Sequence, residues 1–124
     1  MQRNEFVRKL VLNAICDGYE NVDQCILPEV AAVGTKCGID ITRSEVVHAL
    51  TKLVEDGLAK AYRLSTTKPH STELEGMPPL DEVEEFFETY FFITPEGMEV
   101  HMADDWWPLD EHGNLIPGFI PPGS

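Results

Sequence analysis

The side chains best suited to catalysis or metal binding are histidines and cysteines, and their spacing favours neither activity. The histidines are His48, His70, His101 and His112, and the cysteines are Cys16, Cys25 and Cys37. A helical metal site needs two histidines four residues apart with a carboxylate beside them, and no pair has that spacing. No glycine-rich phosphate loop is present. The cysteines are odd in number and fit no metal-ligand spacing, which favours reduced, mostly buried thiols. We therefore expect no enzyme activity, no metal and no cofactor.

Charge is distributed unevenly along the chain, which bears on the class of partner. Residues 1–68 contain nine basic and nine acidic residues, whereas residues 69–124 contain thirteen acidic residues and no lysine or arginine, so the net charge of −13 arises in the second half. A surface of this sign repels nucleic-acid phosphates, whose contacts require basic groups. The same charge run is also usual for a solvated face that keeps a protein soluble.

The best-defined element that would position any working side chain is a helix over residues 42–56. Thr42 and Glu45 fit a capping box, in which each side chain accepts a hydrogen bond from the other residue's backbone amide. Gly57 supplies the left-handed residue that ends a helix. Residues 58–64 then alternate in polarity, as in a half-buried strand. The apolar stripe of the helix consists of Val46, Ala49, Leu50, Leu53 and Val54.

Two further helices are predicted upstream, over residues 2–16 and from Leu27 to the Cys37-Gly38 pair. Downstream, the composition of residues 65–79 predicts a loop. For residues 80–87 the sequence is compatible with either a short helix or a strand. Residues 90–93 favour a strand. Thr94-Pro95-Glu96 favours the start of a short helix that ends near residue 103, because a hydroxyl cap is followed by proline and an acid. Prolines 117, 121 and 122 exclude a C-terminal helix.

This order of elements resembles the winged helix-turn-helix family of transcription regulators over residues 2 to about 102. The segments LTKLVEDGLAKAYRL and FFITPEGMEVH carry the resemblance. It implies an α+β fold with a three-helix core, a small antiparallel β-wing, a short fourth helix and an irregular proline-rich tail. Residues 1–103 would then form the winged-helix domain, and residues 104–124 an acidic, aromatic extension that packs on or beside it.

The family's usual activity, reading a DNA major groove with the third helix, is the alternative function that the resemblance implies. It would use Arg43, Ser44, Val47, His48, Thr51 and Lys52. Only Arg43 and Lys52 in this set are cations, fewer than most specific DNA-binding proteins use for phosphate contacts. The acidic wing therefore disfavours DNA without excluding it.

The favoured function is that of a regulatory adaptor that binds another protein. A basic protein is one such partner that would suit the acidic second half of the chain. Aromatic residues at positions 86, 87 and 90–92 lie on both sides of any strand drawn there, so one set can face the core while the other is left over. Aromatic side chains dominate interface hot spots. For Trp106 and Trp107 the favoured alternative is that they fold back onto the core. The candidate acidic and aromatic surface comprises Glu84, Glu85, Phe86, Glu88, Tyr90, Trp106 and Trp107.

Length and hydropathy favour a single cytoplasmic domain. The 124 residues include 43% hydrophobic residues, enough for a core without disulfides. The sequence predicts no membrane span and no secretion signal. A homodimer is compatible with the sequence, although the prolines argue against pairing through a long last helix.

Overall fold

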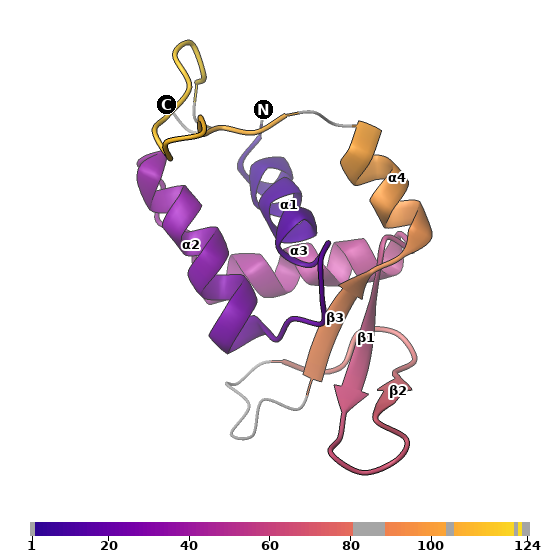
Figure 1. Ribbon diagram of the computed structural model, residues 1–124. Helices are drawn as coiled ribbons and strands as arrows, with labels where there is room; N and C mark the ends of the chain where they lie inside the picture. Colours follow the sequence, from indigo (N-terminus) through magenta and orange to yellow (C-terminus); the bar gives the residue numbers. More distant parts are fainter. Residues whose placement is uncertain (1, 81–88, 104–105, 121, 123–124) are drawn as a thin grey trace.

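The computed structural model describes residues 2–80, 89–103, 106–120 and 122. Within them the protein is an α+β structure with a three-stranded antiparallel sheet in the order β2-β1-β3 (Figure 1). The elements are α1 (Arg3–Ala14), a π-helical turn η1 (Val22–Ile26), α2 (Leu27–Lys36), α3 (Arg43–Glu55), β1 (Ala59–Leu64), β2 (Ser71–Glu73), β3 (Thr89–Ile93) and α4 (Pro95–Ala103). This arrangement is compatible with the winged-helix order expected from the sequence.

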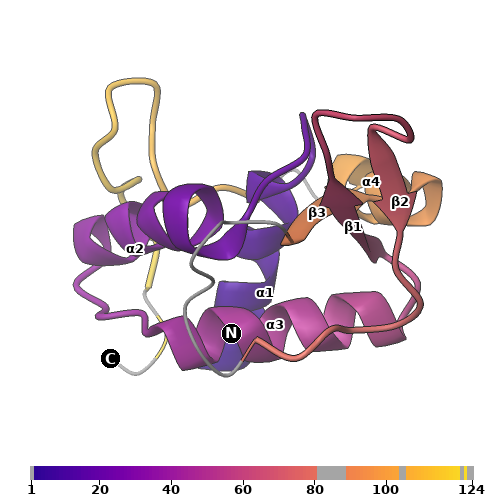
Figure 2. The same cartoon turned by 90° about the horizontal axis from the view of Figure 1, so that it is seen from below.

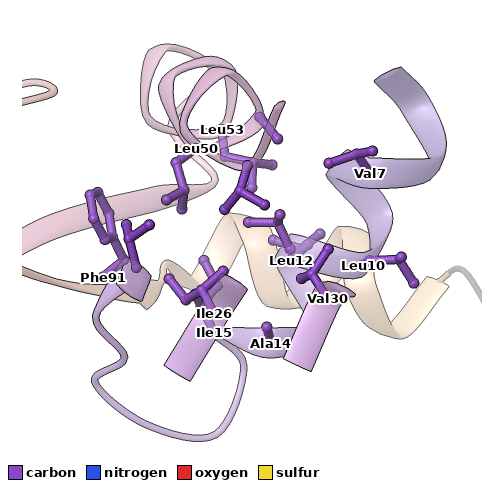
Figure 3. Packing of buried hydrophobic residues seen from close by; sticks show 14 of the residues in the cluster. Val7, Leu10, Leu12, Ala14, Ile15, Ile26, Val30, Leu50, Leu53 and Phe91 are labelled. Carbon is purple, nitrogen blue, oxygen red and sulfur yellow. The ribbon is translucent and has the colours of Figure 1, made fainter. Parts of the chain in front are cut away.

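The hydrophobic core lies between the helices and one face of the sheet. Helix α1 contacts α2, α3 and α4, and it lies between α2 and α4 in Figure 1. Figure 3 shows apolar side chains from α1, η1, α2, α3 and β3 packed in one cluster. Its fully buried members include Phe6, Leu10, Ile15, Ile26, Val30, Leu50, Leu53 and Phe91. The apolar periodicity of residues 2–16 and of residues 42–56 therefore identifies the core faces of α1 and α3 correctly.

The capping box expected at the start of α3 is present. The Thr42 side chain accepts a hydrogen bond from the Glu45 amide at 3.2 Å, and the Glu45 carboxylate accepts one from the Thr42 amide at 3.2 Å. Glu45 also binds the guanidinium of Arg3 at 2.8 Å, which ties the start of α1 to the start of α3. The hydrogen bond from Arg3 lowers the pKa of the Glu45 carboxyl. At the other end, Gly57 has a φ of 75°, as the helix stop requires.

Replacing Thr42 by alanine is expected to lower the free energy of unfolding by about 1 kcal/mol, because the Glu45 amide loses its hydrogen-bond acceptor. Urea denaturation followed by circular dichroism measures this loss. Thr42→Ser is the matched control, since it keeps the hydroxyl, and it should remain within about 0.5 kcal/mol of the wild type. Equal stability of Thr42→Ala and wild type would contradict the cap.

The sheet has one buried and one open face. Residues Ala59, Ala61, Phe91 and Ile93 face the core, and the register pairs Ala61 with Phe91 and Tyr62 with Tyr90. The side chains of Tyr90 and Phe92 are partly exposed on the other face. The expectation that one aromatic set faces the core agrees with Phe91, whereas on the other face Tyr90 is half-buried and Phe92 is half-buried and packs against the core cluster. Beyond β3, Glu20 forms an isolated antiparallel bridge with Phe91.

Two elements differ from the expectation. The loop predicted over residues 65–79 contains β2, which pairs with β1 through Leu64 and Ser71. The second helix begins at Leu27 as predicted, but η1 precedes it directly. In η1 the Ile26 amide donates to the Asn21 carbonyl oxygen, five residues back, at 2.9 Å, and the Asn21 side chain caps the Gln24 amide at 2.7 Å. The alternatives of helix or strand for residues 81–87 lie outside the described residues.

The short helix α4 begins where its hydroxyl cap was predicted. The Thr94 hydroxyl accepts a hydrogen bond from the Gly97 amide at 3.0 Å and donates to the Gly57 carbonyl oxygen at 2.7 Å. The Thr94 amide also donates to the Leu58 carbonyl oxygen at 3.0 Å. The start of α4 is therefore bound to the turn that links α3 to β1.

The described part of the C-terminal segment returns across α1. Trp106, Trp107 and Phe119 pack against the core cluster, in agreement with the fold-back alternative for the tryptophans. The Trp106 ring meets Phe6 edge-on at 5.6 Å between centroids. Asp110 organises a turn by accepting hydrogen bonds from the amides of His112 and Asn114, and Gly113 there has a φ of 78°. Across the described residues, no helix has the length and apolar character needed to cross a bilayer.

Candidate interaction site

Arg43, the first candidate on α3, is engaged within the protein. Its Nε donates to Asp23 Oδ1 of η1 at 2.7 Å, and its Nη1 donates to the Leu80 carbonyl oxygen at 2.6 Å. The side chains of Arg43 and Asp23 are only 20% and 12% exposed. A charge-assisted hydrogen bond in such a shielded position is strong. Arg43 therefore joins α3 to η1 and to the segment that follows β2.

The chain between β2 and Leu80 passes alongside α3, and we call residues 74–80 the crossing segment. Figure 2 shows it running along α3 toward the start of that helix. Leu74 and Met77 pack against the core cluster, and Leu80 is 4% exposed. Leu80 also borders a small hollow shared with Arg43, Ser44 and Val47. The side of α3 that carries Arg43 and Val47 therefore adjoins Leu80 of the same chain.

The other candidate residues of α3 divide into two groups. Ser44, His48 and Lys52 are exposed, whereas Val47 and Thr51 are half-buried. Thr51 donates its hydroxyl proton to the Val47 carbonyl oxygen at 2.8 Å and so is satisfied within the helix. Ser44 and His48 border a groove of about 560 Å³ between α3 and the start of α1. Lys52 lies 3.6 Å from Glu55.

Each of the three cations around this groove and helix has a carboxylate partner. Arg3 binds Glu45, Arg43 binds Asp23, and Lys52 binds Glu55. A cation that is already neutralised within the protein gains less from a phosphate, because the existing ion pair must be weakened to form the new one. The electrostatics of α3 therefore favour a polyanion less than the sequence indicates.

The open face of the sheet carries a cluster of aromatic rings, which we call the aromatic face and define by Tyr19, Tyr62, Tyr90 and Phe92. Tyr19 meets Tyr62 edge-on at 5.1 Å and Phe92 at 5.0 Å between ring centroids. Tyr62 and Tyr90 are cross-strand partners. Tyr19 is 44% exposed, and the other three rings are half-buried. Such rings present large, rigid contact area at low conformational cost, which suits them to binding.

A hollow of about 670 Å³ adjoins the aromatic face where β1 and β3 meet the start of α4. Tyr62 and Phe92 border it on one side, and Asp56, Lys60 and Glu96 contribute charge to its rim. Lys60 is paired with Glu73 at 2.6 Å. In the part of the chain that the structure describes, neither Asp56 nor Glu96 forms a contact ion pair. The rim of the hollow therefore has net negative charge.

The pKa values of Tyr62 and Lys60 are shifted in the direction that this environment favours. Burial raises the pKa of the Tyr62 hydroxyl, and the nearby Glu73 raises it further. The hydrogen bond to Glu73 raises the pKa of the Lys60 ammonium, and Glu96 contributes to the same rise. The carboxylate contributions to both pKa shifts have the expected sign, because negative charge disfavours a phenolate and favours an ammonium.

The candidates for the acidic and aromatic surface have different outcomes. Tyr90 lies on the aromatic face. Trp106 and Trp107 contact the core, and Lys9 Nζ lies 5.6 Å from the Trp106 ring centroid. Glu84, Glu85, Phe86 and Glu88 lie outside the residues that the structure describes. Sequence reasoning missed Tyr19 and Tyr62. The alternation of β1, in which Tyr62 follows Ala61 and so falls on the face opposite the core-facing Ala59 and Ala61, is the signal that could have found Tyr62.

The cysteines of the described chain are free thiols with raised pKa values. No group of three or more His, Cys, Asp or Glu side chains among the described residues has the geometry to hold a metal ion. The three thiols are free, and Cys37 is buried. Burial raises the pKa of the Cys16 thiol to about 11, and a hydrogen bond from its Sγ to Asp17 Oδ1 at 3.3 Å adds to this shift. Burial also raises the pKa values of Cys25 and Cys37.

Cys16 is therefore expected to react slowly with iodoacetamide at neutral pH, because the thiolate is the reactive form. Its alkylation rate, followed by mass spectrometry of peptides, should rise about tenfold per pH unit without a plateau below about pH 10. Asp17→Asn should bring the plateau to lower pH by removing the adjacent negative charge. A plateau near pH 8 in the wild-type protein would contradict the shielded thiol.

Comparison with protein-family models, with characterised proteins and with solved structures gives no match for this chain. The functional assignment therefore rests on the geometry of the chain itself.

Proposed function

We propose that this protein is a non-enzymatic, winged-helix-type interaction module that binds a protein partner. The observation that carries the proposal is the aromatic face. Tyr19, Tyr62 and Phe92 gather on the sheet face opposite the core-facing residues, where their rings contact one another and remain partly exposed. Exposed aromatic clusters with a polar rim are typical of protein-binding surfaces.

Several features of α3 support a protein partner over DNA. The crossing segment runs alongside α3, and Arg43 donates hydrogen bonds to the Asp23 carboxylate and to the Leu80 carbonyl oxygen. The thirteen acidic residues after position 68 add repulsion toward a phosphate backbone. The order of helices and strands, with Glu20 bridging β3, supports the winged-helix part of the proposal.

DNA binding through α3 is the second candidate function. The observation that favours it is the exposed stripe of Ser44, His48 and Lys52, whose spacing places these three side chains on one side of the helix. Ser44 and His48 of this stripe border the groove at the start of α1.

Affinity purification with the whole chain as bait, with and without nuclease, distinguishes the two functions. We expect a protein partner that remains bound after nuclease treatment, and no saturable binding of a labelled random-sequence duplex in fluorescence anisotropy at physiological salt. Recovery of nucleic acid alone would refute the proposal. So would saturable duplex binding that is abolished by Lys52→Glu.

A further inference from the structure

We infer that the aromatic face and its adjoining hollow bind an arginine side chain of a basic, partly apolar peptide segment in the partner. This inference rests on the proposed function and names the site and the chemistry of its ligand. The juxtaposition that carries it is a pair of aromatic rings, Tyr62 and Phe92, beside two carboxylates, Asp56 and Glu96, around one hollow.

The rings supply the first half of the recognition. A cation over the face of Tyr or Phe is attracted by the ring quadrupole, and arginine also stacks its planar guanidinium on such faces. Tyr62 and Phe92 are half-buried, and both contact Tyr19, so their orientations are restricted before any ligand arrives. Binding to restricted rings loses little conformational entropy.

The carboxylates supply the second half. Lys60 is the cation that borders the hollow, and Glu73 compensates its charge at 2.6 Å. Asp56 and Glu96 remain without a contact ion pair among the described residues, so they can receive a ligand cation. A guanidinium can donate to a carboxylate through two parallel hydrogen bonds. The hollow of about 670 Å³ has room for that group and its aliphatic stem.

The same charges disfavour other occupants. A nucleic-acid phosphate or an acidic peptide would meet Asp56 and Glu96 directly, and like charges in contact reduce affinity. A second copy of this chain carries a net charge of −13, so it brings repulsion with it. The apolar part of the basic peptide would lie on the remainder of the aromatic face, toward Tyr90.

Titration of the isotope-labelled whole protein with a capped peptide of alternating leucine and arginine, followed by NMR, tests this inference. The control peptide replaces each arginine by citrulline, which keeps the planar shape without the charge. We expect saturable shifts at Tyr19, Tyr62, Phe92 and Glu96, and affinity that falls as salt rises from about 0.05 to 0.5 M. The citrulline peptide should cause no saturable shifts.

Matched variants separate the two halves of the site. Tyr62→Leu should weaken binding of the arginine peptide about fivefold, because the π face is lost, whereas Tyr62→Phe should leave it within about twofold of wild type. Asp56→Asn with Glu96→Gln should weaken it about tenfold at low salt. Glu5→Gln with Glu111→Gln is the matched control, because it also removes two negative charges. Glu5, like Glu96, lies in the first turn of a helix. This double variant should change the affinity for the arginine peptide by no more than about twofold.

The outcomes distinguish this inference from the proposed function. If both double charge variants weaken binding of the arginine peptide equally, that binding reflects the overall acidity of the protein. This result would overturn the inference and leave the proposed function intact. Shifts confined to α3, or an unchanged affinity in Tyr62→Leu, would overturn it in the same way. In a parallel titration, shifts at Ser44, His48 and Lys52 with a random-sequence duplex would instead overturn the proposed function.

Discussion

Arg43→Glu is expected to lower the free energy of unfolding by about 3 kcal/mol. The substitution removes the shielded ion pair with Asp23 and the hydrogen bond to the Leu80 carbonyl oxygen, and it places two carboxylates in contact. A partly buried carboxylate that loses the guanidinium bound to it bears more of the cost of its desolvation. Urea denaturation at neutral pH, followed by circular dichroism and by tryptophan fluorescence, measures the loss.

Lys52→Glu is the matched control, since it reverses the charge of another α3 cation. The Lys52 side chain is 52% exposed, and its contact with Glu55 is 3.6 Å, so the change in stability should stay within about 0.5 kcal/mol. A double-mutant cycle of Arg43→Ala with Asp23→Ala isolates the pair and should give a coupling energy of about 1–3 kcal/mol. If Arg43→Glu unfolds at the same urea concentration as wild type, the tie between α3 and η1 is absent in solution.

This result affects how DNA binding is tested. Loss of duplex binding in Arg43→Glu would not identify a phosphate contact, because the same substitution disturbs the start of α3 and the crossing segment. Lys52→Glu leaves those contacts in place. It is therefore the variant that tests the exposed side of α3.

Gly97→Ala is expected to destabilise the protein by about 3 kcal/mol or more. Gly97 is buried in the first turn of α4, and a Cβ there would overlap the carbonyl oxygen of Leu58 and lie 2.8 Å from Cγ1 of Ile93. The neighbour that would have to move is backbone, and Thr94 holds that backbone by a hydrogen bond to Leu58. Thermal unfolding followed by circular dichroism should show the effect as a large fall in midpoint.

Gly18→Ala provides the comparison for this substitution. A Cβ at Gly18 would meet only Glu20 Oε1, at 3.6 Å, which is an ordinary contact. Its effect should be within about 0.5 kcal/mol, or slightly stabilising, because alanine restricts the unfolded chain. If both glycine variants unfold alike, α4 is not packed closely against the turn after α3.

The elements that the sequence predicts well have local causes. The α3 cap requires only Thr42 and Glu45, three residues apart, and the helix stop requires only Gly57. The start of α4 similarly follows from Thr94 and Pro95. The period of two in β3 separates Phe91 from its neighbours without knowledge of the partner strand. Each of these features can be derived from a short window of residues.

The features that escaped prediction are long-range pairings. Arg43 contacts Asp23, twenty residues away, and Leu80, thirty-seven residues away, and no local pattern identifies either partner. The strand β2 has only three residues, all exposed, so it has no apolar alternation to reveal it. The ring of Tyr19 joins the aromatic face only because the chain after α1 returns past β3 through the Glu20 bridge. Such long-range contacts depend on the folded core and not on residues that are neighbours in the sequence.

The sequence therefore defines the two candidate surfaces to different extents. The α3 surface was named residue by residue through a family resemblance, but the crossing segment and the ion pairs alter its availability. The aromatic face was anticipated only as surplus aromatic residues near position 90. Its location depends on the register that pairs Tyr62 with Tyr90.

The bridge between Glu20 and Phe91 also bears on polymerisation. Along the outer side of β3, the amide and carbonyl of Phe91 bond to Glu20, and the Ile93 amide donates to Ile15 at 3.2 Å. On the opposite side of the sheet, the border is formed by the three residues of β2. Unpaired backbone groups on an edge strand recruit strands from other molecules during fibril growth. An edge strand of three hydrophilic residues is a weak template for this process. Concentrated solutions of this protein should therefore resist edge-to-edge fibrillation.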